Sequence, residues 1–172
     1  MQTNTPTIRY FAYKYGAIIS IITIAFRLII HFMDLTYSGS RVPDIVDYVA
    51  SAACIIIAIV SFRTANEGLL SLVQAVKLGI GTALISSIII VFYVLFFTNV
   101  IEPDFVEKYG NEVTAKKIAE NFPQMTSEKI QEEVDMQAQF YWIIYPIILI
   151  TSCFYGLIVG FVTGLFTKRS KT

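Results

Sequence analysis

Five polar side chains recur along one face of the first apolar segment. Ser20, Thr23, Arg27, His31 and Asp34 follow one another at intervals of three or four residues, a spacing that places them on one side of an α-helix. An arginine at the centre of a lipid-embedded helix costs about 2.5–3.5 kcal/mol. Arg27 lies somewhat outside the centre, where the cost is lower, but we still expect it to face protein or water.

Two interpretations of this face remain open. In one, Arg27 binds an anion such as a lipid phosphate in an outward-facing pocket, because the guanidinium fork matches phosphate geometry. In the other, Arg27 pairs with a carboxylate and fixes the first helix in place, or extends toward the membrane surface. The candidate counter-ions are Asp34, Asp47, Glu102 and Asp104.

His31 is the only histidine of the chain. A histidine titrates near neutral pH and can relay protons or sense pH, but an interfacial histidine paired with a carboxylate is the commoner arrangement. Cys54 and Cys153 lie near the middle of two apolar runs, with no histidine or second cysteine close by in the sequence. We therefore expect no metal site and no cofactor.

Small residues recur every four positions in two apolar runs. One track consists of Gly156, Gly160 and Gly164, and the other of Gly79, Ala83 and Ser87. Such tracks let two helices approach closely in a membrane. We favour packing within one bundle over association between chains, although the sequence does not identify the partner helix.

These residues belong to four long apolar runs, at residues 10–33, 45–62, 78–97 and 141–166. A helix needs about 17–25 apolar residues to cross a bilayer, and all four runs meet that length. The chain is 55% hydrophobic and 15% charged, against about 25% charged in soluble domains. The sequence predicts an all-α membrane protein, a four-helix bundle forming a single membrane domain over residues 1–172.

The connection at residues 98–140 contains nine acidic residues and four lysines. Helical periodicity over residues 104–121, interrupted by Gly110, and again over 127–140 predicts a helical hairpin. We expect its second helix to continue directly into the last span, with a kink at Pro146. Another short helix, at the membrane surface and capped by Asn66, is expected to run into the third span.

The basic residues predict the orientation. One set flanks the spans on the side of the two termini, and this side is expected to be cytoplasmic. Its members are Arg9, Lys14, Arg63, Lys77, Lys168, Arg169 and Lys171. The opposite side carries five basic residues, four of them in the acidic connection, so the hairpin is expected to be extracytoplasmic.

Three segments resemble a bacterial membrane family known as domain of unknown function 4199. They read LVQAVKLGIGTALIS, IEPDFVEKYG and GLIVGFVTGLFTKRS. The resemblance extends over about residues 10–170 in the order of four spans and one long connection. It implies a small bacterial inner-membrane protein and carries no established activity.

The sequence contains no nucleophile motif, no glycine-rich phosphate loop and no basic stripe for nucleic acid. We therefore lean against an enzyme and expect no nucleic-acid partner. The first functional hypothesis is an accessory or scaffold subunit that binds another membrane protein, or a second copy, within the lipid bilayer. The alternative is a small transporter or flippase for an anionic lipid-linked substrate, bound at the polar face of Arg27.

Overall fold

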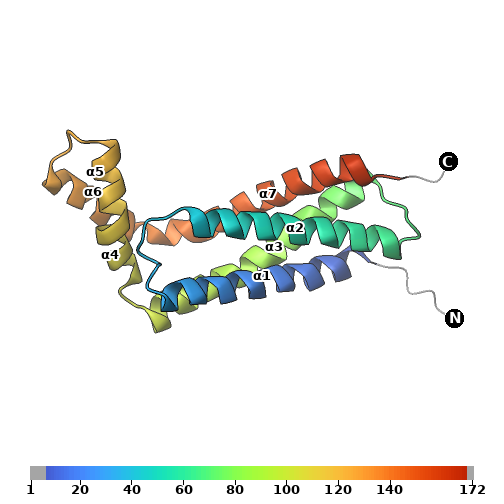
Figure 1. Ribbon diagram of the computed structural model, residues 1–172, viewed down its shortest axis with the longest axis horizontal. Helices are drawn as coiled ribbons and strands as arrows, with labels where there is room; N and C mark the ends of the chain where they lie inside the picture. The colour runs from blue at the N-terminus through green and yellow to red at the C-terminus, as the bar shows by residue number, and fades with distance from the viewer. Residues whose placement is uncertain (1–6, 170–172) are drawn as a thin grey trace.

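Four long helices run side by side in the computed structural model, which describes residues 7–169 (Figure 1). They are α1 (Ile8–Phe32), α2 (Val42–Ala65), α3 (Leu72–Phe96) and α7 (Ile144–Thr167). A π-helical turn extends α3 to Ile101, and a 3₁₀ turn at Tyr141–Ile143 precedes α7. By length and composition each of the four can cross a membrane. The predicted all-α membrane fold is confirmed.

The start of α3 differs from the prediction. Asn66 is not the N-cap of a helix but the C-cap of α2, and its side-chain amide donates a hydrogen bond to the Leu69 carbonyl at 2.9 Å. The helix begins after Ser71, which forms a capping box: Ser71 Oγ accepts from the Gln74 amide, and Gln74 Oε1 accepts from the Ser71 amide. The expected surface helix at residue 66 is therefore wrong, because these reciprocal bonds define a later start.

The start of α1, the end of α7 and the α2–α3 connection lie at the same end of the bundle (Figure 1). Leu70 and Arg169 form an isolated antiparallel bridge there, with N–O distances of 2.9 Å and 2.8 Å. This bridge ties the connection to the residues that follow α7. Of the basic residues used to predict the orientation, Lys171 lies outside the described residues.

The opposite end carries the helical segment between the third and fourth spans. Here α4 (Phe105–Tyr109), a π-helical turn (Gly110–Thr114) and α5 (Ala115–Asn121) follow one another without a break. After a short turn, α6 (Ser127–Gln139) packs back against them. A Cβ atom on Gly110 would lie 2.8 Å from Val134 Cγ1, so this glycine lets α6 approach the turn.

The passage from α6 into α7 also corrects the prediction. The two helices are not continuous, because the 3₁₀ turn at Tyr141–Ile143 separates them. Pro146 consequently lies in the first turn of α7 rather than inside a longer helix. Amides of a first turn have no partner within the helix, so a proline there removes no hydrogen bond and requires no kink.

The tightest packing joins α3 to α7. A Cβ atom on Gly156 would lie 2.7 Å from Ala83 Cβ, and one on Gly160 would lie 2.9 Å from the Ala75 carbonyl oxygen. One on Gly164 would lie 2.8 Å from Ala75 Cβ. The glycines of α7 and the small residues of α3 thus bring the two helices nearly into backbone contact.

The apolar core is concentrated near the terminal end of the bundle. It includes Phe11 of α1, Ile59 and Phe62 of α2, and Leu78 of α3, all buried. Phe11 and Phe62 meet edge to face with ring centroids 5.6 Å apart. The other half of the bundle is less filled, and the candidate site lies there.

Candidate functional site

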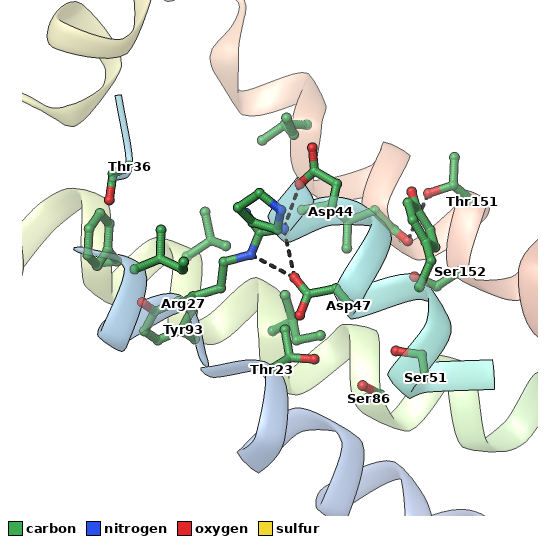
Figure 2. A pocket seen from close by; sticks show the side chains of 18 of the residues that line it. Thr23, Arg27, Thr36, Asp44, Asp47, Ser51, Ser86, Tyr93, Thr151 and Ser152 are labelled. Carbon is green, nitrogen blue, oxygen red and sulfur yellow. Dashed lines mark hydrogen bonds and ion pairs between the residues drawn. The ribbon is translucent and has the colours of Figure 1, made fainter. Parts of the chain in front are cut away.

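A cavity of about 590 Å³ lies between α1, α2, α3 and α7, in the half of the bundle nearest α4. Phe105 and Tyr109 of α4 line it as well. Pockets that hold small ligands measure about 300–1,000 Å³, so the cavity has the size of a ligand site. Figure 2 shows polar side chains from all four long helices around it.

Arg27 is held by two carboxylates of α2 (Figure 2). Its Nε donates to Asp47 Oδ2 at 2.7 Å, and its Nη2 donates to Asp44 Oδ1 at 2.7 Å. Nη2 also lies 2.7 Å from Asp47 Oδ2. The side chains of Arg27, Asp44 and Asp47 are 39%, 54% and 17% exposed, so solvent or a ligand can reach the cluster.

The start of α2 explains why the carboxylates lie there. Pro43 occupies the first turn, where its missing amide costs no hydrogen bond, and Asp44 follows it. Negative side chains are favoured at a helix N-terminus. Asp47 was predicted as a partner of Arg27, whereas Asp44 was missed. Asp44 lies three residues before Asp47, which places both carboxylates on one face of the helix. This spacing was the sequence signal that could have predicted Asp44 as a second partner of Arg27.

His31 belongs to a second polar group. Its Nδ1 lies 3.5 Å from Glu102 Oε2, and Glu102 Oε1 accepts a hydrogen bond from Lys108 Nζ at 3.2 Å. The His31 ring meets the edge of Phe97, with centroids 5.0 Å apart. Two of the predicted site residues, His31 and Glu102, therefore lie together, but apart from the carboxylates that hold Arg27.

The environment of Glu102 favours its ionised form. Burial alone raises the pKa of this carboxyl. The neighbouring Tyr37 hydroxyl, the hydrogen bond from Lys108 and the charges of Lys108 and His31 together outweigh that effect, so the pKa lies below its ordinary value of 4.5. Burial and the adjacent Glu102 carboxylate in turn raise the pKa of Tyr37.

Two predicted counter-ions lie elsewhere. Asp34 follows α1 with a φ of 58° and is exposed. Asp104 precedes α4 and is exposed as well. Among residues 7–169 neither forms an ion pair. Arg27 takes its partners from α2 because α1 and α2 are joined by a short connection that brings their adjoining ends together.

Hydroxyl groups line the inner part of the cavity (Figure 2). A hydroxyl on an apolar helix commonly donates to a carbonyl of the preceding turn, as Thr151 does to Ile147 at 2.7 Å. In the described part of the chain, the hydroxyls of Thr23, Ser51 and Ser152 have no hydrogen-bond partner. These three groups remain free to bind water or a ligand.

Aromatic rings line much of the remaining wall, among them Tyr48, Tyr93, Phe97, Tyr141 and Tyr155. The Tyr155 hydroxyl donates to the Tyr48 carbonyl at 2.5 Å, and the two rings lie 5.5 Å apart. This contact joins α2 to α7.

Four apolar helices around a partly open cavity, whose wall is mostly apolar with several polar groups, define a multi-pass helical membrane protein with a candidate ligand site. Residues 14–169 match the family described as protein of unknown function (DUF4199), and the chain belongs to that family. The resemblance found in the sequence is thereby confirmed. No curated protein and no solved structure gives a significant match to the chain.

Proposed function

We propose that this membrane protein binds a small molecule or a lipid headgroup in the cavity between α1, α2, α3 and α7. The cavity itself carries the proposal. Protein interiors are close-packed, with few voids larger than a water molecule, whereas this space measures about 590 Å³. A ligand there would account for the loosely filled half of the bundle.

The wall chemistry supports a ligand rather than empty space. Polar groups inside a membrane are costly unless they are paired or serve a site. The free hydroxyls of Thr23, Ser51 and Ser152 line the cavity, and the carboxylates at Arg27 are partly exposed. An anionic lipid-linked substrate, the alternative considered from the sequence, fits less well, because Arg27 already binds two carboxylates.

The proposal includes an orientation. The basic residues at the terminal end favour a cytoplasmic location for that end, and the family resemblance favours the bacterial inner membrane. The cavity lies in the opposite half, nearest α4. In this orientation α4, α5 and α6 are extracytoplasmic, and the ligand reaches the cavity from the outer side.

Native mass spectrometry of protein extracted from its own membrane tests the binding role. Ser51→Trp and Ser152→Trp place an indole into the cavity from α2 and from α7. Ala53→Trp is the matched control, since Ala53 is exposed on the same helix as Ser51. We expect a bound species on the wild type and on Ala53→Trp that both cavity variants lose while retaining cooperative unfolding. An unchanged bound profile in all variants would overturn the proposal.

A second candidate is the accessory subunit expected from the sequence. The segment α4–α6 projects from the end of the bundle (Figure 1). It exposes Phe122 and Met136, which are 51% and 48% accessible, next to acidic side chains. We expect Phe122→Ser with Met136→Ser to release a partner that co-purifies stoichiometrically with the wild type. If purification yields only this chain, the binding role stands alone.

A further inference from the structure

We infer that the ligand is an organic cation: an ammonium group attached to an apolar portion. This inference rests on the proposed binding role and adds the charge of the ligand. Three features of the cavity carry it, namely its charge balance, its aromatic rings and the state of Arg27.

The charge balance of the cavity wall is negative. Two carboxylates, Asp44 and Asp47, meet a single guanidinium, that of Arg27. His31 also lines the cavity, but its carboxylate partner Glu102 is already matched by Lys108. Asp47 is the more enclosed of the two carboxylates, at 17% exposed, and unpaired charge is unfavourable where solvent is partly excluded. The N-terminus of α2 stabilises a carboxylate only modestly, so a cationic ligand would neutralise the negative charge that Arg27 leaves unmatched.

The aromatic lining adds a second attraction for a cation. A ligand ammonium is bound by the face of a tyrosine or phenylalanine ring within about 6 Å. Tyr48, Tyr93 and Tyr155 lie around the carboxylate-bearing part of the cavity, on three different helices. Within residues 7–169, the one cation–ring contact is that of Lys14 with Tyr15, at the other end of α1. Within these residues, therefore, no lysine or arginine contacts the faces of the aromatic rings that line the cavity.

Arg27 is poorly placed to bind an anion. Nε and Nη2 of Arg27 bind Asp47 and Asp44, which leaves Nη1 for an incoming phosphate. A phosphate at Nη1 would lie close to two carboxylates and would be repelled by them. A cation meets no such repulsion, since Arg27 keeps both partners and the ligand adds to the negative side of the cluster. The isoleucines in the wall, such as Ile55, Ile90 and Ile148, suit the apolar part of the ligand.

Titration calorimetry with three probes of equal tail length tests the charge. The full-length protein in dodecyl maltoside micelles, which carry no ammonium group, is titrated with hexyltrimethylammonium, hexyl phosphate and hexanol. We expect hexyltrimethylammonium to bind at least about tenfold more tightly than either of the others, and more weakly as salt is added. If hexyltrimethylammonium binds no more tightly than the other two probes, the inference that the ligand is a cation is wrong. The binding role itself is tested separately, by mass spectrometry. If hexyl phosphate is the only probe that binds, the ligand is an anion instead.

Substitutions connect the affinity to the cluster. Asp44→Asn makes the cluster neutral and should raise the Kd for hexyltrimethylammonium about tenfold, given the strength of charge pairs near a protein surface. Asp34→Asn removes the same charge outside the cavity and should leave the Kd within about twofold. Tyr93→Leu provides a second route if Asp44→Asn unfolds, with an expected loss of about three- to tenfold. Unchanged affinity in a folded Asp44→Asn or Tyr93→Leu protein would contradict the inference.

The cation could be a soluble amine or the ammonium of a lipid headgroup. Adding phosphatidylethanolamine to the micelles separates the two sources. If the ligand is the lipid headgroup, the apparent Kd for hexyltrimethylammonium rises with the phosphatidylethanolamine fraction. A Kd that does not change with this lipid assigns the site to a soluble amine.

Discussion

At the scale of single residues, Arg27 shows how a charge is accommodated inside an apolar helix. Two carboxylates of α2 bind it, and the three side chains together link α1 to α2. These two helices otherwise make far less contact than α3 makes with α7. The cluster is consequently both part of the candidate site and a brace for the open half of the bundle.

Removing Arg27 alone should destabilise the protein more than removing Arg27 together with the charge of Asp47. Arg27→Gln leaves two neighbouring carboxylates without a cation, and we expect a loss of about 1–3 kcal/mol, below the value for fully buried pairs because the cluster is partly exposed. Adding Asp47→Asn to Arg27→Gln should recover part of that loss. Denaturant unfolding in mixed micelles, analysed as a double-mutant cycle, measures the coupling. Additive effects of the two substitutions would show that the pair stabilises nothing.

Glu102 should make the stability depend on pH. Its pKa is lower in the folded protein than its ordinary value of 4.5, so its contribution is fully present above that value. The contribution is lost as the pH falls through the lowered pKa. We expect the melting temperature to fall below about pH 4.5 and to fall less in Glu102→Gln. Glu128→Gln, at an exposed site of α6, is the control and should keep the wild-type slope.

At the scale of elements, the α3–α7 contact is the structural centre of the bundle. A Cβ atom on Gly160 would lie 2.9 Å from the Ala75 carbonyl oxygen and 3.2 Å from Val76 Cα. Both neighbours are backbone atoms that cannot move without moving the helix. The space at Gly160 therefore fixes how closely α7 packs against α3.

Gly160→Ala should separate these helices. Overpacking a tight contact costs about 1–3 kcal/mol, and we expect a loss of that size in mixed-micelle unfolding. Val162→Ala is the control, because Val162 lies on the same helix and is 47% exposed. Its effect should stay within about 0.5 kcal/mol. If the Gly160→Ala protein is as stable as the wild type, α7 adjusts its position without a loss of stability.

The four spans were predictable because their apolar runs match the thickness of a bilayer, and each helix contains the predicted run almost entirely. The helix starts were less predictable. Asn66 and Ser71 are both acceptable N-caps, and only the Gln74 side chain favours Ser71. Within the site, Asp47 was predicted as a counter-ion of Arg27 from its place at the start of the second span. The cavity was not, since it depends on how four helices diverge.

At the scale of the whole molecule, the two ends of the bundle differ. The terminal end contains the apolar core and the Leu70–Arg169 bridge. The opposite end contains the cavity, the charged clusters and the helices α4–α6. Formal net charge is zero, so the asymmetry lies in where the charges sit. It leads to a prediction about orientation.

Cysteine labelling in intact cells measures that orientation. With Cys54 and Cys153 replaced by alanine, Glu120→Cys marks α5 and Ala65→Cys marks the end of α2. Basic residues near the ends of spans keep those ends in the cytoplasm. A membrane-impermeant maleimide should therefore label Glu120→Cys in intact cells and Ala65→Cys only after permeabilisation.

The opposite labelling pattern would reverse the side from which the ligand enters but leave the cavity intact. The charge of the ligand and the side of entry are therefore independent, because the first depends on Asp44 and Asp47 and the second on the residues that flank the spans. If Glu120→Cys is labelled from outside, the carboxylates near α4 face a solution from which a cation can enter directly. If it is labelled only after permeabilisation, the same site draws its ligand from the cytoplasm.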